Sequence, residues 1–208
     1  MMDLLFSEPL DGLEHKAAAF LFDCDGTLVD TMGAHYDSWL DVLRSEEVTA
    51  DLSYDRFCDW GGMAGERVAR EICLELSLPH NPTELAERKR SHFLSRDHRH
   101  PVIFPVADFA RKVSETHPMA VVSGGNRVAV DRTLRDADLL DLFDVVVTPE
   151  DVAHGKPAPD MFLLAAERMG IAPEGCWVIE DGPPGIVGAR AAGMNVVAIG
   201  AAANQQLK

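Results

Sequence analysis

Five short runs of apolar residues are spread along the chain, and polar or turn-forming residues bound each of them. Three of the runs are rich in Val and Ile, and the apolar positions are near-continuous rather than alternating with polar ones. Runs of this kind are typical of strands that are covered on both faces of a sheet. The predicted strands are Ala17–Phe22, Met119–Val122, Val145–Val147, Trp177–Ile179 and Val196–Ile199.

Helical patterns lie between these runs. Phe162, Leu163, Ala166 and Met169 recur at helical spacing, after two prolines and before Gly170. Prolines at the start and a glycine at the end are the usual boundaries of a helix. Strands that alternate with helices form a parallel sheet with right-handed crossovers. The pattern therefore predicts an α/β fold with a Rossmann-like parallel sheet.

The stretch between the first and second predicted strands breaks this alternation. A crossover between parallel strands needs only about a dozen residues, whereas residues 31–100 hold three helical patterns in succession. We therefore expect a helical lobe, the cap, at 31–100, inserted into a core of residues 1–30 plus 101–208, with hinges near Asp30 and Pro101. Asp30 and Thr31 are expected to cap the first cap helix. The apolar or helix-face residues that mark the three helices are Tyr36, Trp39, Leu40 and Leu43, then Val68, Ala69, Ile72, Cys73 and Leu76, then Leu85, Lys89, Phe93 and Leu94.

Composition limits the classes of function. The 208 residues include 34 acidic and 19 basic side chains, a formal net charge of −15. Proteins that bind nucleic-acid phosphates usually present a basic face, so we expect no nucleic-acid partner. No apolar run reaches the ~18 residues of a membrane span, and the four cysteines lack metal-binding spacing. We expect a cytoplasmic protein without a membrane partner, and a monomer, because residues 201–208 carry no interface signal.

Polar residues follow the predicted strands. In open α/β sheets, ligands bind at the carboxyl ends of the strands, so these residues should converge on one edge of the sheet. Asp23 and Asp25 follow the first strand, and Ser123 and Gly124 follow the second. The segments at the strand ends are Asp23–Thr27, Ser123–Gly125, His154–Pro157 and Glu180–Gly182.

This set of residues points to metal-assisted phosphoryl transfer. Four carboxylates in a small site repel one another unless a cation neutralises them, and all-oxygen ligation favours Mg²⁺. Lys156 and Ser123 can supply a charge and a hydroxyl donor to a phosphoryl group. Asp23 can attack phosphorus to form an aspartyl-phosphate, and Asp25 can protonate the leaving oxygen and later deprotonate water.

Four motifs together resemble the haloacid dehalogenase superfamily. They are Asp23-x-Asp25-Gly26-Thr27, Ser123 after a Val-rich strand, Lys156-Pro157-Ala158-Pro159-Asp160 and Glu180-Asp181-x3-Gly185. The position of the insert, together with the forms of the third and fourth motifs, resembles the β-phosphoglucomutase-like group. Within that group the chain is similar to small sugar-phosphate phosphatases of the fructose-1-phosphate type, and the resemblance covers residues 17–199.

The resemblance implies roles for individual residues. Asp23 is implied as nucleophile and Asp25 as general acid and base. The Asp23 carboxylate, the Asp25 backbone carbonyl and Asp181 are implied as Mg²⁺ ligands, with Glu180 ligating or orienting them. The transferring phosphoryl group is expected to be bound by Ser123, Gly124 and Lys156. The residues that match substrate-contacting or closure positions less securely are His35, Arg67, Lys89 and Asn126.

The leading hypothesis is a Mg²⁺-dependent phosphatase for a small phosphorylated metabolite. A phosphoglucomutase is the alternative within the fold, but relatives with that activity carry a Ser-Lys pair where this chain has Gly125-Asn126 followed by Arg127. A dehalogenase has no use for Asp25 or for Mg²⁺. A non-catalytic regulatory module is the alternative from another class, and the complete set of catalytic positions argues against it.

Overall fold

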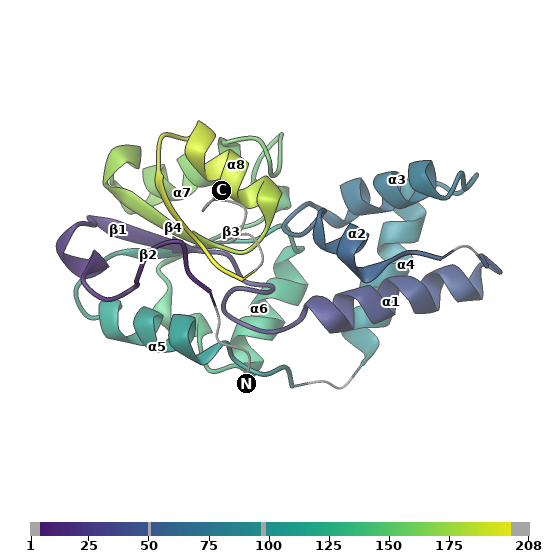
Figure 1. The fold of residues 1–208 in the computed structure, drawn as a ribbon, viewed down its shortest axis with the longest axis horizontal. Coiled ribbons are helices and arrows are strands. Elements are labelled where there is room, and N and C mark those ends of the chain that lie inside the picture. The colour runs from purple at the N-terminus through teal and green to yellow at the C-terminus, as the bar shows by residue number, and fades with distance from the viewer. Residues whose placement is uncertain (1–4, 50, 97–98, 201–208) are drawn as a thin grey trace.

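The computed structural model describes residues 5–49, 51–96 and 99–200. Five strands form one parallel sheet in the order β3-β2-β1-β4-β5 (Figure 1), which confirms the predicted α/β fold. The strands are β1 (Ala19–Phe22), β2 (Met119–Val122), β3 (Val145–Val147), β4 (Cys176–Glu180) and β5 (Asn195–Ala198). The bounds of β2 and β3 are those predicted, and the other three differ by one or two residues, a normal uncertainty at element ends.

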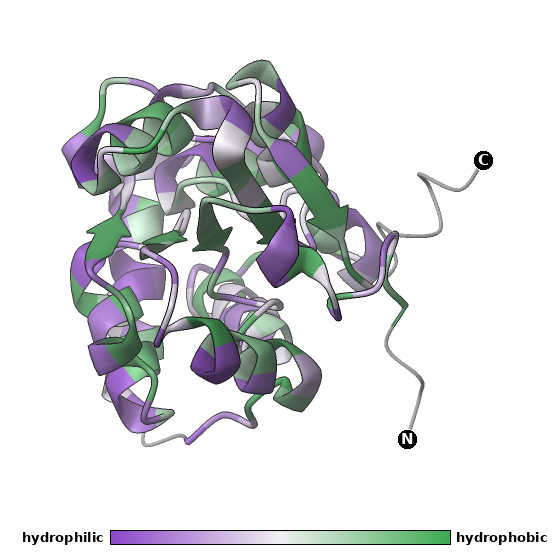
Figure 2. Ribbon diagram, turned by 90° about the vertical axis from the view of Figure 1, so that its left-hand side faces the viewer, coloured by the Kyte–Doolittle hydropathy of each residue, from purple (hydrophilic) through white to green (hydrophobic). Residues whose placement is uncertain are grey.

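Helices cover both faces of the sheet. Figure 1 shows α5 (Phe104–Val113) and α6 (Arg127–Asp136) on one face, and α7 (Asp160–Met169) and α8 (Pro183–Ala191) on the other. Short 3-10 helices occupy Leu13–His15 (η1), Leu140–Leu142 (η2), Pro149–Asp151 (η3) and Pro173–Gly175 (η4). In Figure 2 the hydrophobic strands lie between these two helical layers, as burial on both faces requires.

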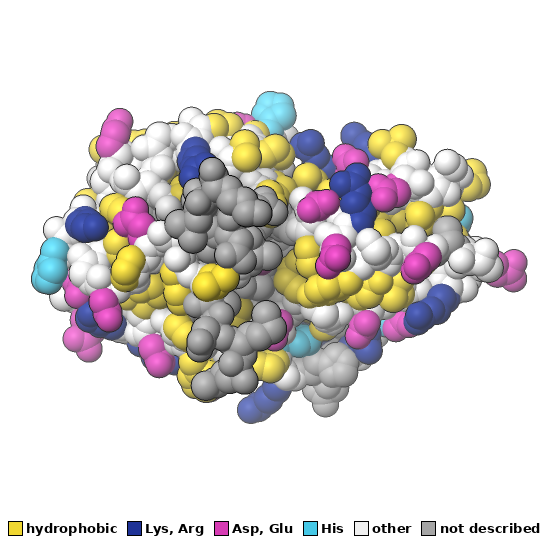
Figure 3. All heavy atoms as spheres, viewed as in Figure 1, with side chains coloured by type: hydrophobic (Ala, Val, Ile, Leu, Met, Phe, Trp, Pro, Cys, Tyr) yellow, Lys and Arg dark blue, Asp and Glu magenta, His cyan; other side chains and the backbone are white. Residues whose placement is uncertain are grey.

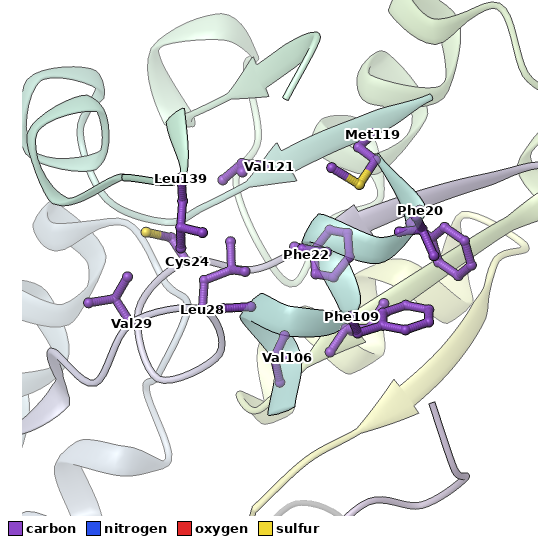
Figure 4. Packing of buried hydrophobic residues seen from close by; sticks show 14 of the residues in the cluster. Phe20, Phe22, Cys24, Leu28, Val29, Val106, Phe109, Met119, Val121 and Leu139 are labelled. Carbon is purple, nitrogen blue, oxygen red and sulfur yellow. The ribbon is translucent and has the colours of Figure 1, made fainter. Parts of the chain in front are cut away.

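Alternate residues of β1 build two separate hydrophobic clusters. Phe20 and Phe22 belong to the cluster under α5 and α6, whereas Ala19 and Leu21 belong to the one under α7 and α8. Figure 4 shows Phe20 and Phe22 beside Phe109 of α5, and the rings of Phe20 and Phe109 meet edge to face with centroids 5.1 Å apart. The period of two along the strand thus fixes which side chains face which layer.

The cap lies beside the core (Figure 1) and consists of α1 (Met32–Ser45), α2 (Tyr54–Cys58), α3 (Gly65–Glu75) and α4 (Pro82–Ser95). It has its own hydrophobic cluster, in which Trp39, Ile72 and Leu85 are buried. Figure 3 shows acidic and basic side chains interspersed on the visible face of the cap. The division into a core of 1–30 plus 101–208 and a cap of 31–100 stays a prediction, and this separate cluster supports it.

The two segments that join cap and core run side by side. Val29 and Val102 form an antiparallel bridge, and the Asp30 N–H donates to the Pro101 carbonyl over 2.9 Å. Arg132 of α6 donates to the carbonyls of Leu94 and Arg96, at the end of α4. These contacts set the place at which the cap meets the core, and the proposed hinges near Asp30 and Pro101 stay a prediction.

Among the described residues, no helix is long and apolar enough to cross a membrane. The tail at 201–208, on which the expectation of a monomer was based, lies outside the described residues. The expectations of a monomeric and cytoplasmic protein therefore stay predictions.

The packing predicts a large loss of stability when a core aromatic is truncated. Phe20 is fully buried, so Phe20→Ala should lower the free energy of unfolding by about 3–5 kcal/mol through lost burial and a cavity. Phe104, at 65% exposure, provides a matched control, and Phe104→Ala should change stability little. Urea unfolding measures both, and similar losses for the two variants would contradict the packing described.

Candidate active site

The turn after β1 positions two of the predicted carboxylates. The Asp23 N–H continues the strand ladder by donating to the Ile179 carbonyl over 3.0 Å. Gly26 then takes a φ of +88°, and a Cβ at this position would lie 2.3 Å from Asp181 Oδ2. Only glycine meets both conditions, because other residues rarely adopt this φ and none fits so close to the carboxylate. The turn thereby brings Asp181 of the β4 end against the β1 end.

A buried lysine connects three of the four strand ends. Lys156 Nζ donates to Asp23 Oδ1 over 2.6 Å and to Glu180 Oε2 over 2.8 Å. All three side chains are almost completely buried, with exposed fractions of 0 to 2%. An ammonium group in such a place requires nearby negative charge. The structure therefore brings together residues 23, 156 and 180, as the motifs predicted.

The charges of this cluster shift one another's pKa values. Burial and the Glu180 carboxylate raise the pKa of Asp23 well above its ordinary range, against the opposing effect of Lys156. Burial and Glu180 also raise the pKa of Asp181 to about 7, although the Thr27 hydroxyl donates to Asp181 Oδ1 over 2.8 Å. Burial disfavours the charge on Lys156, but Asp23 and Glu180 outweigh it and raise the pKa of Lys156. The carboxylates therefore hold more negative charge than one lysine neutralises.

The same cluster fits a divalent cation. Among the described residues, Asp23, Glu180 and Asp181 offer carboxylate oxygens that all lie within 4.8 Å of one another. Asp23 Oδ2 is buried without a hydrogen-bond partner, which is costly unless another ligand satisfies it. Three carboxylates against one ammonium group leave an excess of two negative charges when all are ionised. An all-oxygen set with this excess suits a hard divalent cation such as Mg²⁺ or Ca²⁺.

Glu180 is fixed by the backbone that follows it. The Gly182 N–H donates to Glu180 Oε1 over 2.9 Å, so that Oε2 points to Lys156. Gly185 of α8 makes room for the carboxylate, because a Cβ there would lie 1.9 Å from Glu180 Oε2. The glycine of the fourth motif is thus a packing requirement of the glutamate. Glu180 orients Lys156 and closes the charge cluster.

Asp25 lies in a second hydrogen-bonded group that reaches into the cap. Its Oδ1 accepts from Thr31 Oγ1 over 2.6 Å and lies 3.1 Å from His35 Nε2. The other ring nitrogen of His35 lies 2.5 Å from Lys89 Nζ. Because an ammonium group can only donate, His35 Nδ1 accepts from Lys89 and Nε2 donates to Asp25. Thr31 occupies the N-cap position of α1, as expected, but its hydroxyl makes no capping hydrogen bond and binds Asp25 instead.

This group holds Asp25 ionised. Burial alone would raise the pKa of Asp25, but His35, the Thr31 hydroxyl and Lys89 together lower it below its ordinary value. Burial lowers the pKa of Lys89 to about 8, against the attraction of Asp25. Burial and Lys89 lower the pKa of His35. The cap thus controls the charge state of a core carboxylate through residues on α1 and α4.

The loop after β2 faces the cap directly. The Ser123 hydroxyl accepts from the Gly125 N–H over 3.1 Å, and the Asn126 side chain caps α6 by accepting from the Ala129 N–H over 2.8 Å. A Cβ on Gly124 would lie 2.1 Å from the carbonyl oxygen of Gly62 in the cap. The cap backbone therefore rests on the loop that was predicted to bind the phosphoryl group.

A cavity of about 370 Å³ lies between cap and core. The predicted site residues that line it are Asp23, Asp25, His35, Lys89, Ser123, Gly124 and Asn126. Lys156, Glu180 and Asp181 lie behind it, around Asp23. Arg67 is exposed on α3 and is not among the lining residues.

Sequence reasoning missed most of the cap wall of this cavity. The wall includes Trp39, Trp60, Met63, Arg90 and Phe93. Two of these carried a readable signal, because Trp39 is four residues from His35 and Phe93 is four residues from Lys89, on the same helical faces. The segment that holds Trp60 and Met63 shows no periodic pattern, so its approach to the core was not predictable.

Comparisons with known proteins identify the family of the chain. The family model for haloacid dehalogenase-like hydrolases matches residues 17–193. A fructose-1-phosphate phosphatase from Escherichia coli (strain K12) is 35% identical over 184 residues, which cover 88% of this chain and 96% of that protein. The hexitol phosphatase A of the same organism is 32% identical over 203 residues, covering 91% and 86% of the two chains. The crystal structure of a hydrolase from Pseudomonas syringae shares the fold, with a TM-score of 0.77, 24% identity and coverage of 86% and 83%.

The chain belongs to the haloacid dehalogenase-like hydrolases, and its relatives place it with the phosphatases of that family. The resemblance drawn from the four motifs is confirmed.

The pKa of Asp181 predicts that metal binding depends on pH. Below pH 7 a proton occupies this carboxylate and a cation must displace it, so affinity should fall as the pH falls. For one displaced proton, Mg²⁺ should bind about tenfold more weakly at pH 6 than at pH 8. Isothermal titration calorimetry at the two pH values measures this ratio. The exposed-carboxylate variant Asp108→Asn should show the same ratio as the wild type, and equal wild-type affinity at both pH values would contradict the prediction.

Proposed function

We propose that the protein is a Mg²⁺-dependent phosphatase that hydrolyses a small phosphorylated metabolite, a sugar phosphate in the first instance, through an aspartyl-phosphate on Asp23. The observation that carries the proposal is the buried Lys156, held between Asp23 and Glu180 at 2.6 and 2.8 Å. One oxygen of Asp23 is fixed by this lysine, and the other is buried without a partner in a residue that lines the cavity.

Asp23, Asp181 and the Asp25 backbone carbonyl would hold the Mg²⁺, with Glu180 orienting the set through Lys156. The bound ion supplies positive charge to the transferring phosphoryl group and screens the approach of the Asp23 carboxylate to it. Ser123 and the backbone of Gly124 would bind phosphoryl oxygens at the core side of the cavity, and Lys156 would add its charge from behind Asp23.

The reaction would proceed in two displacements at phosphorus. The Asp23 carboxylate oxygen bonds to phosphorus while the ester P–O bond breaks, and the leaving oxygen takes a proton from Asp25. A water molecule then attacks the same phosphorus, Asp25 takes its proton, and the bond between Asp23 and phosphorus breaks. Inorganic phosphate leaves, Asp23 is again a free carboxylate, and Asp25 releases the proton of the attacking water to solvent.

The charge state of Asp25 suits its role as base, and the first step requires it to gain a proton. His35, Thr31 and Lys89 favour its ionised form in the free site. A phosphoryl group brings negative charge next to Asp25, and like charge raises the pKa of a carboxyl. Substrate binding would therefore favour uptake of a proton from solvent by Asp25, and the departing alcohol would carry that proton away.

The geometry favours the phosphatase over the phosphoglucomutase. A mutase must bind a second phosphate at the far end of its substrate, and the Ser-Lys pair of mutase relatives corresponds to Gly125-Asn126 here. The Asn126 side chain is occupied as the cap of α6. The neighbouring Arg127 donates to the Val146 carbonyl over 2.7 Å and to Asp151 over 2.9 Å, so it is engaged by the core.

The proposal predicts phosphate release that depends on Asp23. Wild-type protein should release phosphate from sugar phosphates with Mg²⁺ and not with EDTA, and Asp23→Asn should reduce turnover by at least about a thousandfold because the nucleophile is lost. Asp108→Asn, the same change at an exposed site, should retain wild-type turnover. A malachite-green assay over a panel of sugar phosphates measures release, and activity in Asp23→Asn close to that of the wild type would contradict the role of Asp23.

The comparison with a mutase gives a separate prediction. With β-glucose 1-phosphate and Mg²⁺, the products should be inorganic phosphate and glucose, because the Asn126 and Arg127 side chains are engaged by α6 and by the core and do not provide a second phosphate site. Phosphorus NMR distinguishes the products directly. Accumulation of glucose 6-phosphate would show that the phosphoryl group is transferred back to the sugar rather than to water, and would contradict the phosphatase proposal.

A further inference from the structure

Residues of both cap and core line the cavity. Its apolar surface includes Trp39, Phe57, Trp60 and Phe93 of the cap. With a volume of about 370 Å³, the cavity lies near the lower end of the ~300–1,000 Å³ range of small-molecule sites. A substrate whose phosphate lies at Ser123 would therefore direct the rest of its chain along this wall.

One face of α4 lines the cavity with polar groups. Thr83, Ala86, Arg90 and Phe93 follow one another at helical spacing and all line it. Thr83 Oγ1 donates to Glu66 Oε1 over 3.0 Å. Arg90, in contrast, makes no hydrogen bond or ion pair with any residue that the structure describes. Its guanidinium group thus has five N–H donors available to a ligand.

The core supplies a carboxylate to the same cavity, on the side that faces the cap. Glu150 of η3 is exposed, lines the cavity, and uses Oε1 to accept from the Arg127 N–H over 3.2 Å. Glu66 and Glu87 of the cap also line the cavity. Glu66 pairs with Arg70 over 3.5 Å, so Glu87 and Glu150 are the carboxylates that accompany Arg90, while Lys89, the other lining lysine or arginine, is engaged with His35.

This combination selects one chemistry for the far end of the substrate. A second phosphate or a carboxylate would satisfy Arg90 but would be repelled by Glu87 and Glu150. A hydroxyl group both donates and accepts, so it can bind a guanidinium group and a carboxylate at once. An uncharged chain of hydroxyl groups also has C–H faces that can pack on the aromatic wall.

Resting on the proposed function, we propose that Arg90 of the cap and Glu150 of the core are specificity-determining residues. They bind hydroxyl groups of an uncharged polyol chain and disfavour phosphoesters that carry a second anionic group. Because the two residues come from different bodies, a substrate that binds both connects the cap to the core.

Variants on one helix test the role of Arg90. Arg90→Ala should lower kcat/KM for fructose 1-phosphate, relative to that for p-nitrophenyl phosphate, at least about tenfold. The reason is that p-nitrophenyl phosphate has no hydroxyl groups for Arg90 to bind, so it loses no contact in the variant. The control is Arg88→Ala, two residues away, whose side chain pairs with Glu46 outside the cavity. This variant should leave the ratio unchanged. An unchanged ratio in Arg90→Ala would overturn the proposal.

A matched pair of substrates tests Glu150. Fructose 1,6-bisphosphate differs from fructose 1-phosphate only by a phosphate at the far end, and the wild type should prefer the monophosphate. Glu150→Gln should reduce that preference, whereas Glu167→Gln on the exposed side of α7 should not. A wild type that prefers the bisphosphate, or a preference that Glu150→Gln leaves intact, would count against the proposal.

Binding measurements separate this inference from the proposed function. Calorimetry with Mg²⁺ and fructose 1-phosphate is performed on Asp23→Asn protein with and without Arg90→Ala. Weaker binding without Arg90 by about tenfold supports the specificity role even if no compound is turned over, in which case the phosphatase proposal alone fails. Equal or undetectable binding in both proteins overturns the specificity role.

Discussion

The ammonium group of Lys156 is the point on which the site depends. It is buried at the carboxyl edge of the sheet and keeps its charge only because Asp23 and Glu180 lie at 2.6 and 2.8 Å. Those carboxylates lie there because β1 and β4 are neighbours, and Gly26 and Gly185 allow close approach of the β4-end carboxylates. Removing one partner would leave a buried charge unpaired. The order of the strands, the two glycines and the charged side chains therefore all serve to keep Lys156 paired.

Lys156 neutralises only part of the carboxylate charge around it, and the remaining negative charge determines which groups this site can bind. Asp23, Glu180 and Asp181 share a small volume, and one oxygen of Asp23 lacks a partner. A divalent cation would supply the positive charge that this cluster lacks, and the proposed role of Asp23 uses its unpartnered oxygen. The cap adds a separate control, because Thr31, His35 and Lys89 set the ionisation of Asp25 from outside the core. Core residues thus carry the proposed reaction, and cap residues set the charge of its proposed acid and base, Asp25.

The core of this account was predictable from the sequence, because short-range pattern determines it. Apolar runs located the strands, and parallel topology places the polar residues that follow them on one edge. The cap side was less predictable. Lys89 and Arg67 look alike as helix-surface charges, yet Lys89 reaches His35, 54 residues away in the sequence, and Arg67 is exposed. Thr31 resembles a helix cap but binds Asp25. Helix–helix packing decides such contacts, and one sequence does not specify it.

The central claim is that Asp23 carries the phosphoryl group during turnover. The most direct measurement is rapid acid quench during turnover of a sugar phosphate with Mg²⁺, followed by borohydride reduction and peptide mass spectrometry. The account predicts reduction of the acyl phosphate at position 23 to homoserine, only when substrate and Mg²⁺ are both present. Rapid phosphate release without any modification at position 23, or modification of a different carboxylate, would contradict it.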